Sequence, residues 1–245
     1  MAATAWYTHY PAIKSVKVNQ FVQDGIKLLT ELYGQPVVPI KKVRLCYSLP
    51  LDTESELRKH FQLCEMVDEE AGEFAIYLSH QPDAYSFHGQ LGHEIAHLLN
   101  ANMYDAYIEG LNTLFAEKLL TQENLDWSGW ANYFQQGNDA FYAHTYHMMR
   151  EIDEFLIDGE LSNFLDFAEP ISEESTEQKI NIEAWLDTLS QEKRDVVKFI
   201  IFNYAARIEI ARRKSHSVYH FAIPHRCSCE CHSCKSSEKR KKQDD

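Results

Sequence analysis

The chain has 245 residues, of which 44% are hydrophobic and 25% are charged, and its formal net charge is −13. This length is enough to bury a sizeable core, and the composition is ordinary for a globular protein in water. The acidic balance argues against a nucleic-acid-binding protein, because phosphate backbones attract clusters of lysine and arginine.

Hydrophobic periodicity predicts the elements in chain order. The predicted helices cover residues 14–33, 52–67, 91–100, 105–120, 139–157, 179–189 and 191–213. The alternating runs K-K-V-R-L-C-Y-S-L (41–49) and E-F-A-I-Y-L-S (73–79) predict two strands ahead of the helix at 91–100. We expect a turn-rich connection at 126–138 and a surface loop at 158–177.

This pattern favours an α+β fold that is predominantly helical. We expect one domain over residues 1–214, made of a small sheet lobe at about 1–90 and a helical lobe at about 91–214. Residues 215–245 lose the periodicity and read as a tail rich in Cys, His and Lys.

Residues 91–100, L-G-H-E-I-A-H-L-L-N, combine two histidines and a glutamate at a spacing that suits metal chemistry. His93 and His97 lie four positions apart, so a helix places both imidazoles on one face, one turn apart. Glu94 lies beside them, within reach of a metal-bound water. This is the H-E-x-x-H arrangement, in which two histidines bind zinc and the glutamate acts as a general base.

A catalytic zinc needs a third protein ligand and one open position. Glu109 is the first candidate, because it lies twelve residues after His97, at the start of the next predicted helix. Glu117, two helical turns further on, is the second candidate. A third histidine at short range is absent, since the next one after His97 is His144.

The motif H-E-I-A-H followed by Y-I-E-G-L-N-T-L-F-A-E-K-L-L resembles the gluzincin metallopeptidases, a peptidase MA-like class. The likeness covers about residues 70–157. The run 73–79 resembles the edge strand along which such enzymes lay an extended substrate. The run F-Y-A-H-T-Y-H-M-M-R-E-I resembles the helix that packs behind their site. The short spacing to Glu109 also resembles the small intracellular peptidases of this class that cleave regulators, and the two branches stay open.

The resemblance implies a zincin-like fold and a zinc-dependent peptidase that acts on a peptide or protein substrate. Zn²⁺ would be held by His93, His97 and Glu109, and Glu94 would accept a proton from the attacking water. The oxyanion needs a donor opposite the metal. The candidates for this donor are Tyr142, His144, Tyr146 and His147, and we favour Tyr146 or His147.

Three other interpretations stay open at this stage. The chain can be a zincin-like binding or regulatory protein without turnover, or a zinc hydrolase that acts on a bond other than a peptide. It can also be a structural helical protein that carries the motif by chance, in which case residues 1–215 would bind no zinc tightly.

The cysteines favour a reducing compartment. Cys46 and Cys64 lie in the body of the chain, and the other four lie within H-R-C-S-C-E-C-H-S-C-K at 225–235. We expect a disordered tail there, with a metal-binding tail or a contact for an acidic partner as alternatives. The first eleven residues lack signal-peptide features, and the apolar run at 196–211 is too charged to span a membrane. We therefore expect a cytoplasmic protein.

Overall fold

The fold is described from a computed structural model, which defines residues 10–48, 63–79, 84, 86–156 and 159–225. The α-helices of these residues are α1 (Val16–Tyr33), α2 (Phe87–Ala96), α3 (Ala106–Gln122), α4 (Ser128–Gln135), α5 (Ala140–Phe155), α6 (Ile182–Leu186) and α7 (Gln191–Lys214). The 3₁₀ helices are η2 (His97–Leu99) and η3 (Phe164–Phe167). The strands are β1 (Lys42–Tyr47), β2 (Leu63–Asp68), β3 (Glu73–Leu78), β4 (Ala168–Pro170) and β5 (Gln178–Ile180).

The first three strands form a sheet in the order β1-β3-β2, with β1 parallel and β2 antiparallel to β3. The central strand β3 is almost entirely buried, because it carries apolar side chains on both faces. Phe74 and Ile76 join the main core beneath α1 and α2, whereas Ala75 and Tyr77 face a smaller cluster with Tyr10 on the opposite face. Because β3 lies in the middle of the strand order, β2 lies at an edge of this sheet.

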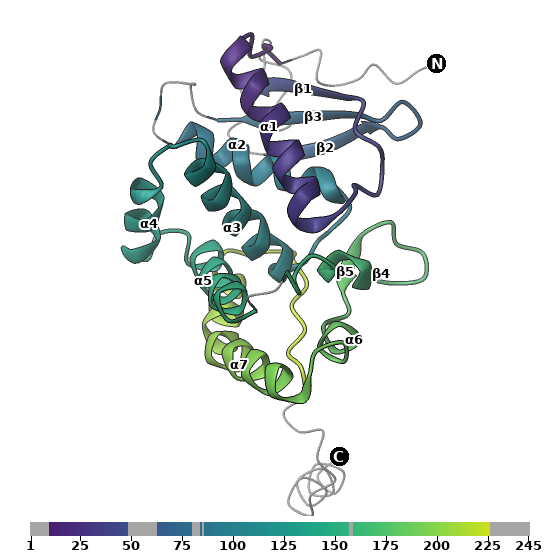
Figure 1. The fold of residues 1–245 in the computed structure, drawn as a ribbon, viewed down its shortest axis with the longest axis vertical. Coiled ribbons are helices and arrows are strands. Elements are labelled where there is room, and N and C mark those ends of the chain that lie inside the picture. The colour runs from purple at the N-terminus through teal and green to yellow at the C-terminus, as the bar shows by residue number, and fades with distance from the viewer. Residues whose placement is uncertain (1–9, 49–62, 80–83, 85, 157–158, 226–245) are drawn as a thin grey trace, which may run out of the picture.

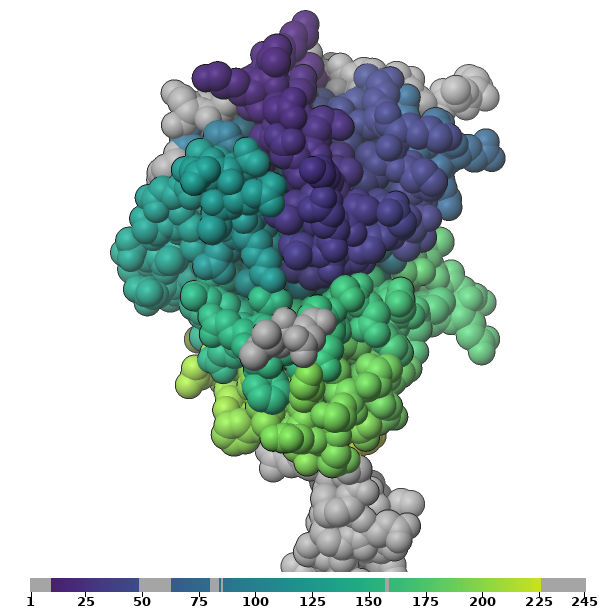
Figure 2. Space-filling view, viewed as in Figure 1, coloured from purple at the N-terminus to yellow at the C-terminus, as the bar shows by residue number. Residues whose placement is uncertain are grey.

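The helices α1, α2 and α3 form the layer beside the sheet, with α1 crossing in front in Figure 1. Helix α1 approaches the other two at Gly25, where a Cβ atom would lie 3.0 Å from a methyl of Leu119 and 3.1 Å from a methyl of Ile95. Helix α1 ends at Gly34, whose φ of 88° is a conformation that glycine adopts without strain. In the space-filling view, α1 covers the front of the sheet-bearing half, and the helices of the other half lie below it (Figure 2).

The lower half of the molecule packs α5 between α3 and α7. Residues 217–225, which follow α7, turn back and pair with the chain just before α3: the N–H of Ala106 donates to the carbonyl of His220 at 2.8 Å. Asp105 is fully buried where three segments meet, since its carboxylate accepts from the N–H groups of Tyr107 and Ile180. The chain after α7 is thereby fixed against the start of α3.

The α+β, predominantly helical class predicted from the sequence is confirmed, as are the long helices and the two strands β1 and β3. None of the described helices combines the length and the apolarity needed to cross a membrane. Residues 217–225, which sequence assigned to the tail, pack into the fold, whereas the cysteines Cys227, Cys229, Cys231 and Cys234 lie outside the described residues.

Four local predictions were wrong. The end of the helix predicted at 52–67 is strand β2, and its beginning falls outside the described residues. The run 73–79 is the central strand β3 rather than an edge strand, and β1 and β2 form the two edges. The connection at 126–138 contains the helix α4, and strands β4 and β5 replace part of the predicted loop at 158–177 and helix at 179–189. Short amphipathic segments carry too few periods to separate helix from strand.

Gly110→Ala is expected to destabilise the protein by about 2 kcal/mol, because overpacking a close helix contact outweighs the gain in helix propensity. A Cβ atom at residue 110 would lie 2.3 Å from the backbone carbonyl oxygen of Thr145 on α5, which cannot rotate away. The control is Gly25→Ala, whose Cβ meets only side-chain methyls and should change stability by less than about 1 kcal/mol. Urea unfolding midpoints measure both, and equal midpoints would contradict the expectation.

Candidate metal centre

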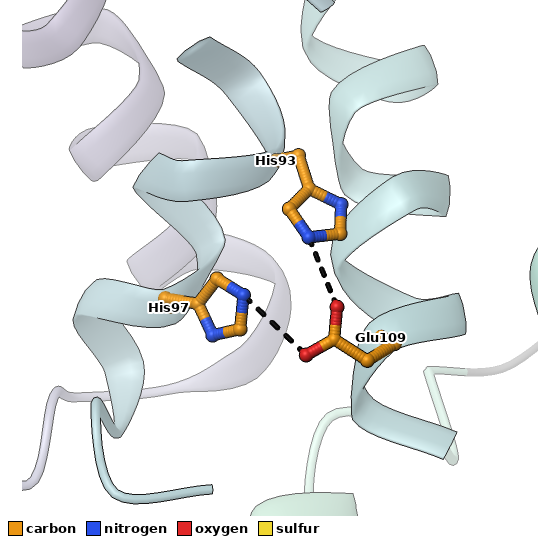
Figure 3. Close-up of side chains that lie close together, drawn as sticks. All are labelled: His93, His97 and Glu109. Atoms are coloured by element: carbon orange, nitrogen blue, oxygen red, sulfur yellow. Dashed lines mark hydrogen bonds and ion pairs between the residues drawn. The ribbon is translucent and has the colours of Figure 1, made fainter. Parts of the chain in front are cut away.

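The two histidines of the motif lie where α2 ends. The apolar residues Leu91, Ile95 and Leu98 bury one side of this segment in the core. This fixes the opposite side toward α3, so His93 on α2 and His97 at the start of η2 project into the space between the two segments (Figure 3). Asp105 caps α3 by accepting from the N–H of Tyr107, which sets the start of the helix that carries Glu109.

Glu109 meets both imidazoles with its two carboxylate oxygens, as Figure 3 shows. Its Oε2 lies 3.1 Å from Nε2 of His93, and its Oε1 lies 3.6 Å from Nε2 of His97. One ligand atom from each residue lies within 4.8 Å of the others, and within the described part of the chain this is the group of three that meets that spacing. The predicted trio is therefore brought together.

Thr113 orients His93, and the sequence interpretation did not include it. Its hydroxyl donates to the carbonyl of Glu109 at 2.9 Å, one turn earlier on α3. The same oxygen lies 3.1 Å from Nδ1 of His93. Since the hydroxyl proton is already used, Thr113 accepts from Nδ1–H, which directs Nε2 of His93 at Glu109, where a metal ion could replace the Nε2 proton. Metal binding through Nε2 needs this Nδ1–H form of the ring.

The group fits a small metal ion. The Glu109 side chain is fully buried; the hydroxyl of Tyr219 donates to its carboxylate, and Oε1 makes no close hydrogen bond within the described residues, with Nε2 of His97 at 3.6 Å. An unpaired buried carboxylate oxygen is costly unless a cation compensates it. Ligands about 2.0–2.2 Å from a tetrahedral zinc lie about 3.3 Å apart, close to the two distances that join Glu109 to the imidazoles. His93, His97 and Glu109 can therefore hold a metal ion.

In the metal-free chain the protonation states of His97 and Glu109 suit metal ligands, whereas a metal ion would have to displace a proton from His93. Burial lowers the pKa of His97 to about 4, so its imidazole is neutral at pH 7 and has a lone pair to offer. Burial also acts to lower the pKa of His93, but the hydrogen bond and charge of Glu109 outweigh it and raise that pKa. Burial opposes ionisation of Glu109, yet His97 and His93 hold its pKa below the ordinary value. The carboxylate is therefore ionised.

Glu94 lies next to this group and is only 5% exposed. Burial raises its pKa to about 7, against an opposing effect of His93. Its carboxylate also accepts a hydrogen bond from the backbone N–H of Cys64 on β2. The edge strand of the sheet thus runs directly beside the predicted general base, and a carboxyl with a pKa near neutrality suits proton transfer at neutral pH.

A cavity opens onto the group, with about 150 Å³ of space that water can enter. It is lined by His93, Glu94, His97 and Glu109, and by Leu63 and Cys64 of β2. Two phenols line it as well: Tyr142 from α5 and Tyr219 from residues 217–225. The two hydroxyls share a hydrogen bond, and burial together with the charge of Glu109 raises both pKa values, so both remain protonated donors.

The other predicted donors lie elsewhere. Tyr146 is fully buried, and its hydroxyl donates to Glu117 at 2.8 Å and accepts from the indole N–H of Trp127 at 3.2 Å. His147 contacts the Tyr146 ring, and neither it nor His144 lines the cavity. Glu117, the second candidate ligand, is engaged by Tyr146 and Arg150 rather than by the imidazoles.

Comparisons with known protein families, with curated proteins and with solved structures found no match for this chain. A functional assignment therefore rests on the side chains around the His93, His97 and Glu109 group. Sequence patterns alone could have suggested Thr113, because it lies four positions after Glu109 on the same helix face. They could not have suggested Tyr219, which reaches the cavity only through the path of the chain after α7.

The buried Glu94 gives the metal-free chain a specific pH dependence. Its pKa is about 7 in the folded chain against an ordinary 4.5, so between these values the folded chain holds a proton that the unfolded chain has released. Its contribution to stability is thus full below pH 4.5 and is lost as the pH rises through 7. Glu94→Gln should therefore gain about 3 kcal/mol relative to wild type between pH 4.5 and pH 8.

The measurement is the free energy of unfolding of both metal-free proteins, by urea, across this pH range. The depressed pKa of His97 acts with the opposite sign, since its contribution is lost as the pH falls from 6.5 through 4. Because His97 is present in both proteins, its effect cancels in their difference. A difference that does not change with pH would contradict the expectation.

Proposed function

We propose that this protein is a zinc-dependent peptidase. The observation that carries the proposal is the buried group of His93, His97 and Glu109 with Glu94 beside it, all lining a cavity. Two imidazoles and one carboxylate are a frequent ligand set of catalytic zinc, since they leave a fourth position open. The resemblance of H-E-I-A-H and the following helix to the gluzincins points to the same chemistry.

Features around the cavity support a peptide as the substrate. The edge strand β2 lines the cavity, and its outer side has no partner strand among the described residues. An extended peptide can pair with such an edge through main-chain hydrogen bonds. The scissile bond would then lie near Glu94, because this side chain accepts from the N–H of Cys64 on the same strand.

Each residue around the cavity has a distinct role in the proposed reaction. A bound zinc would supply a polarised carbonyl and a more acidic water. Glu94 accepts the proton of the attacking water and delivers it to the leaving amine. His93 is held in the ligand tautomer by Thr113, and His97 is neutral. The hydroxyls of Tyr142 and Tyr219 donate to the developing oxyanion. We assign this role to them in place of Tyr146 and His147, because they line the cavity.

Zinc content and cleavage of a peptide library by the full chain test the proposal. Wild type should retain one zinc more per chain than His97→Ala, which removes one ligand and leaves the cysteines of 227–234 unchanged. His144→Ala is the matched control, because His144 does not line the cavity, and it should retain the wild-type content. Equal zinc content in wild type and His97→Ala, or zinc without cleavage of any peptide, would refute the peptidase assignment.

A further inference from the structure

Three of the aromatic side chains that line the cavity have no role in the proposed catalysis. We define this aromatic wall as Trp127, Trp130 and Phe134, which come from α4 and the residue before it. Trp127 and Trp130 stack with their ring centroids 6.1 Å apart and their planes at 21°, and Phe134 packs 5.7 Å from Trp130. The wall therefore presents joined ring surfaces to the cavity.

Small residues on α2 and α3 make room for the wall. A Cβ atom at residue 89 would lie 2.0 Å from Nε1 of Trp130, so only glycine lets the indole lie against α2. One turn later, a Cβ atom at residue 92 would lie 3.1 Å from Ala116 on α3. Gly89 and Ala116 line the cavity with the wall. Since Gly89 lies one turn before His93, this apolar space adjoins the metal centre.

A buried polar network fixes the wall from behind. Tyr146 packs its ring 5.6 Å from Phe134, and its hydroxyl accepts from Nε1 of Trp127 at 3.2 Å. Glu117 in turn accepts from that hydroxyl at 2.8 Å. These partners satisfy the polar atoms of Trp127 and Tyr146, whereas Nε1 of Trp130 is buried against Gly89 without a hydrogen-bond partner among the described residues. Tyr146 is thus a positioning residue of this wall.

We propose that the aromatic wall forms a specificity subsite that selects substrates with a large apolar side chain, such as Leu or Phe, at a residue flanking the scissile bond. This proposal rests on the proposed peptidase function and names its substrate class. The rings lining this space beside the metal centre favour an apolar substrate side chain, because its burial against them removes apolar surface from water. Each methylene that fills an apolar pocket gives about 10-fold or more in kcat/KM.

The test uses the zinc-loaded full chain and its Trp130→Ala variant. Peptides that differ only in Leu, Phe or Ala at each flanking position give kcat/KM ratios, and wild type should prefer Leu or Phe at one position by at least about 10-fold. Trp130→Ala should reduce this ratio about 10-fold and leave the zinc content unchanged. The control is Phe199→Ala, which removes an aromatic ring that is 64% exposed on α7 and should leave the ratio unchanged.

A second readout needs no turnover. Two hydroxamates, zinc-binding compounds that carry either a benzyl or a methyl group, are titrated into the same proteins by calorimetry. The benzyl compound should bind wild type at least about 10-fold more tightly, and Trp130→Ala should lose most of that difference. If no peptide is cleaved but this pattern holds, the subsite stands and the peptidase function fails.

Two results would contradict the proposed subsite. Cleavage without a preference for Leu or Phe refutes it while leaving the peptidase function intact, and a preference that Trp130→Ala keeps also refutes it. Tyr146→Phe is the second variant in case Trp130→Ala fails to fold, because it removes only the hydroxyl that holds Trp127. It should weaken the preference for Leu or Phe and keep the wild-type zinc content. An unchanged preference in a folded Tyr146→Phe variant counts against the proposal.

Discussion

Glu94→Gln is expected to lower kcat by about 10²–10⁴-fold while the protein keeps its zinc. Glutamine has nearly the same shape and retains an oxygen to accept the N–H of Cys64, so the strand and the helix should keep their contact. What it cannot do is accept a proton from water or deliver one to the leaving amine. The loss should therefore appear in kcat rather than in KM, since the interaction is made in the transition state.

The measurement is steady-state cleavage of one good peptide by zinc-loaded wild type and variant, with zinc content determined on the same samples. Glu65→Gln provides the matched control. Glu65 is a half-buried carboxylate on β2, next to Cys64, and it accepts a hydrogen bond from Tyr77 instead of lying beside the metal ligands. It should keep activity within a few-fold of wild type. Activity of Glu94→Gln within about 10-fold of wild type would show that Glu94 is not the general base.

The metal ligands could be predicted from the sequence because their information is local. His93 and His97 are one helical turn apart, and Glu109 begins the next helix after a short connection. Two antiparallel helices joined in this way place these side chains opposite each other with little dependence on the rest of the chain. The same locality explains why the long amphipathic helices α1, α5 and α7 were predicted closely.

The rest of the cavity depends on long-range packing. The oxyanion donor was sought on the α5 sequence, where Tyr142 and Tyr146 lie one turn apart and look equivalent. Contacts with other segments distinguish the two tyrosines. Tyr142 packs against His93 of α2 with ring centroids 5.8 Å apart, whereas the hydroxyl of Tyr146 bonds to Glu117 of α3 and to Trp127. No local pattern in residues 140–155 contains that difference.

Strand β2 shows the same limit for secondary structure. Leu63 to Asp68 carries apolar and acidic residues that satisfy either a helix or a strand, and the pairing with β3 decides for the strand. With β2 predicted as a helix, residues 73–79 were expected to be the edge strand along which a substrate would lie. The edge that lines the cavity belongs to β2, whose register is set by its pairing with β3 and not by its own sequence pattern.

Zinc is expected to raise the melting temperature of the metal-free protein by about 5–10 °C when the free metal is about 100 times its dissociation constant. Ligand that binds only the folded chain at that excess adds about 2.7 kcal/mol, and each kcal/mol moves the melting point of a chain of this size by about 2–4 °C. The structural reason is Glu109: it is fully buried between two imidazoles, and its Oε1 makes no close hydrogen bond within the described residues that would take the place of a cation.

Thermal unfolding of the full chain, after chelation and after stepwise return of zinc, measures this gain. His97→Ala should show little of it, because it loses one ligand of the buried group while the cysteines at 227–234 remain. Glu109→Gln should also show little of it, because it removes the carboxylate that would bind the metal. A zinc-dependent rise of equal size in all three proteins would place the stabilising metal outside the group formed by His93, His97 and Glu109.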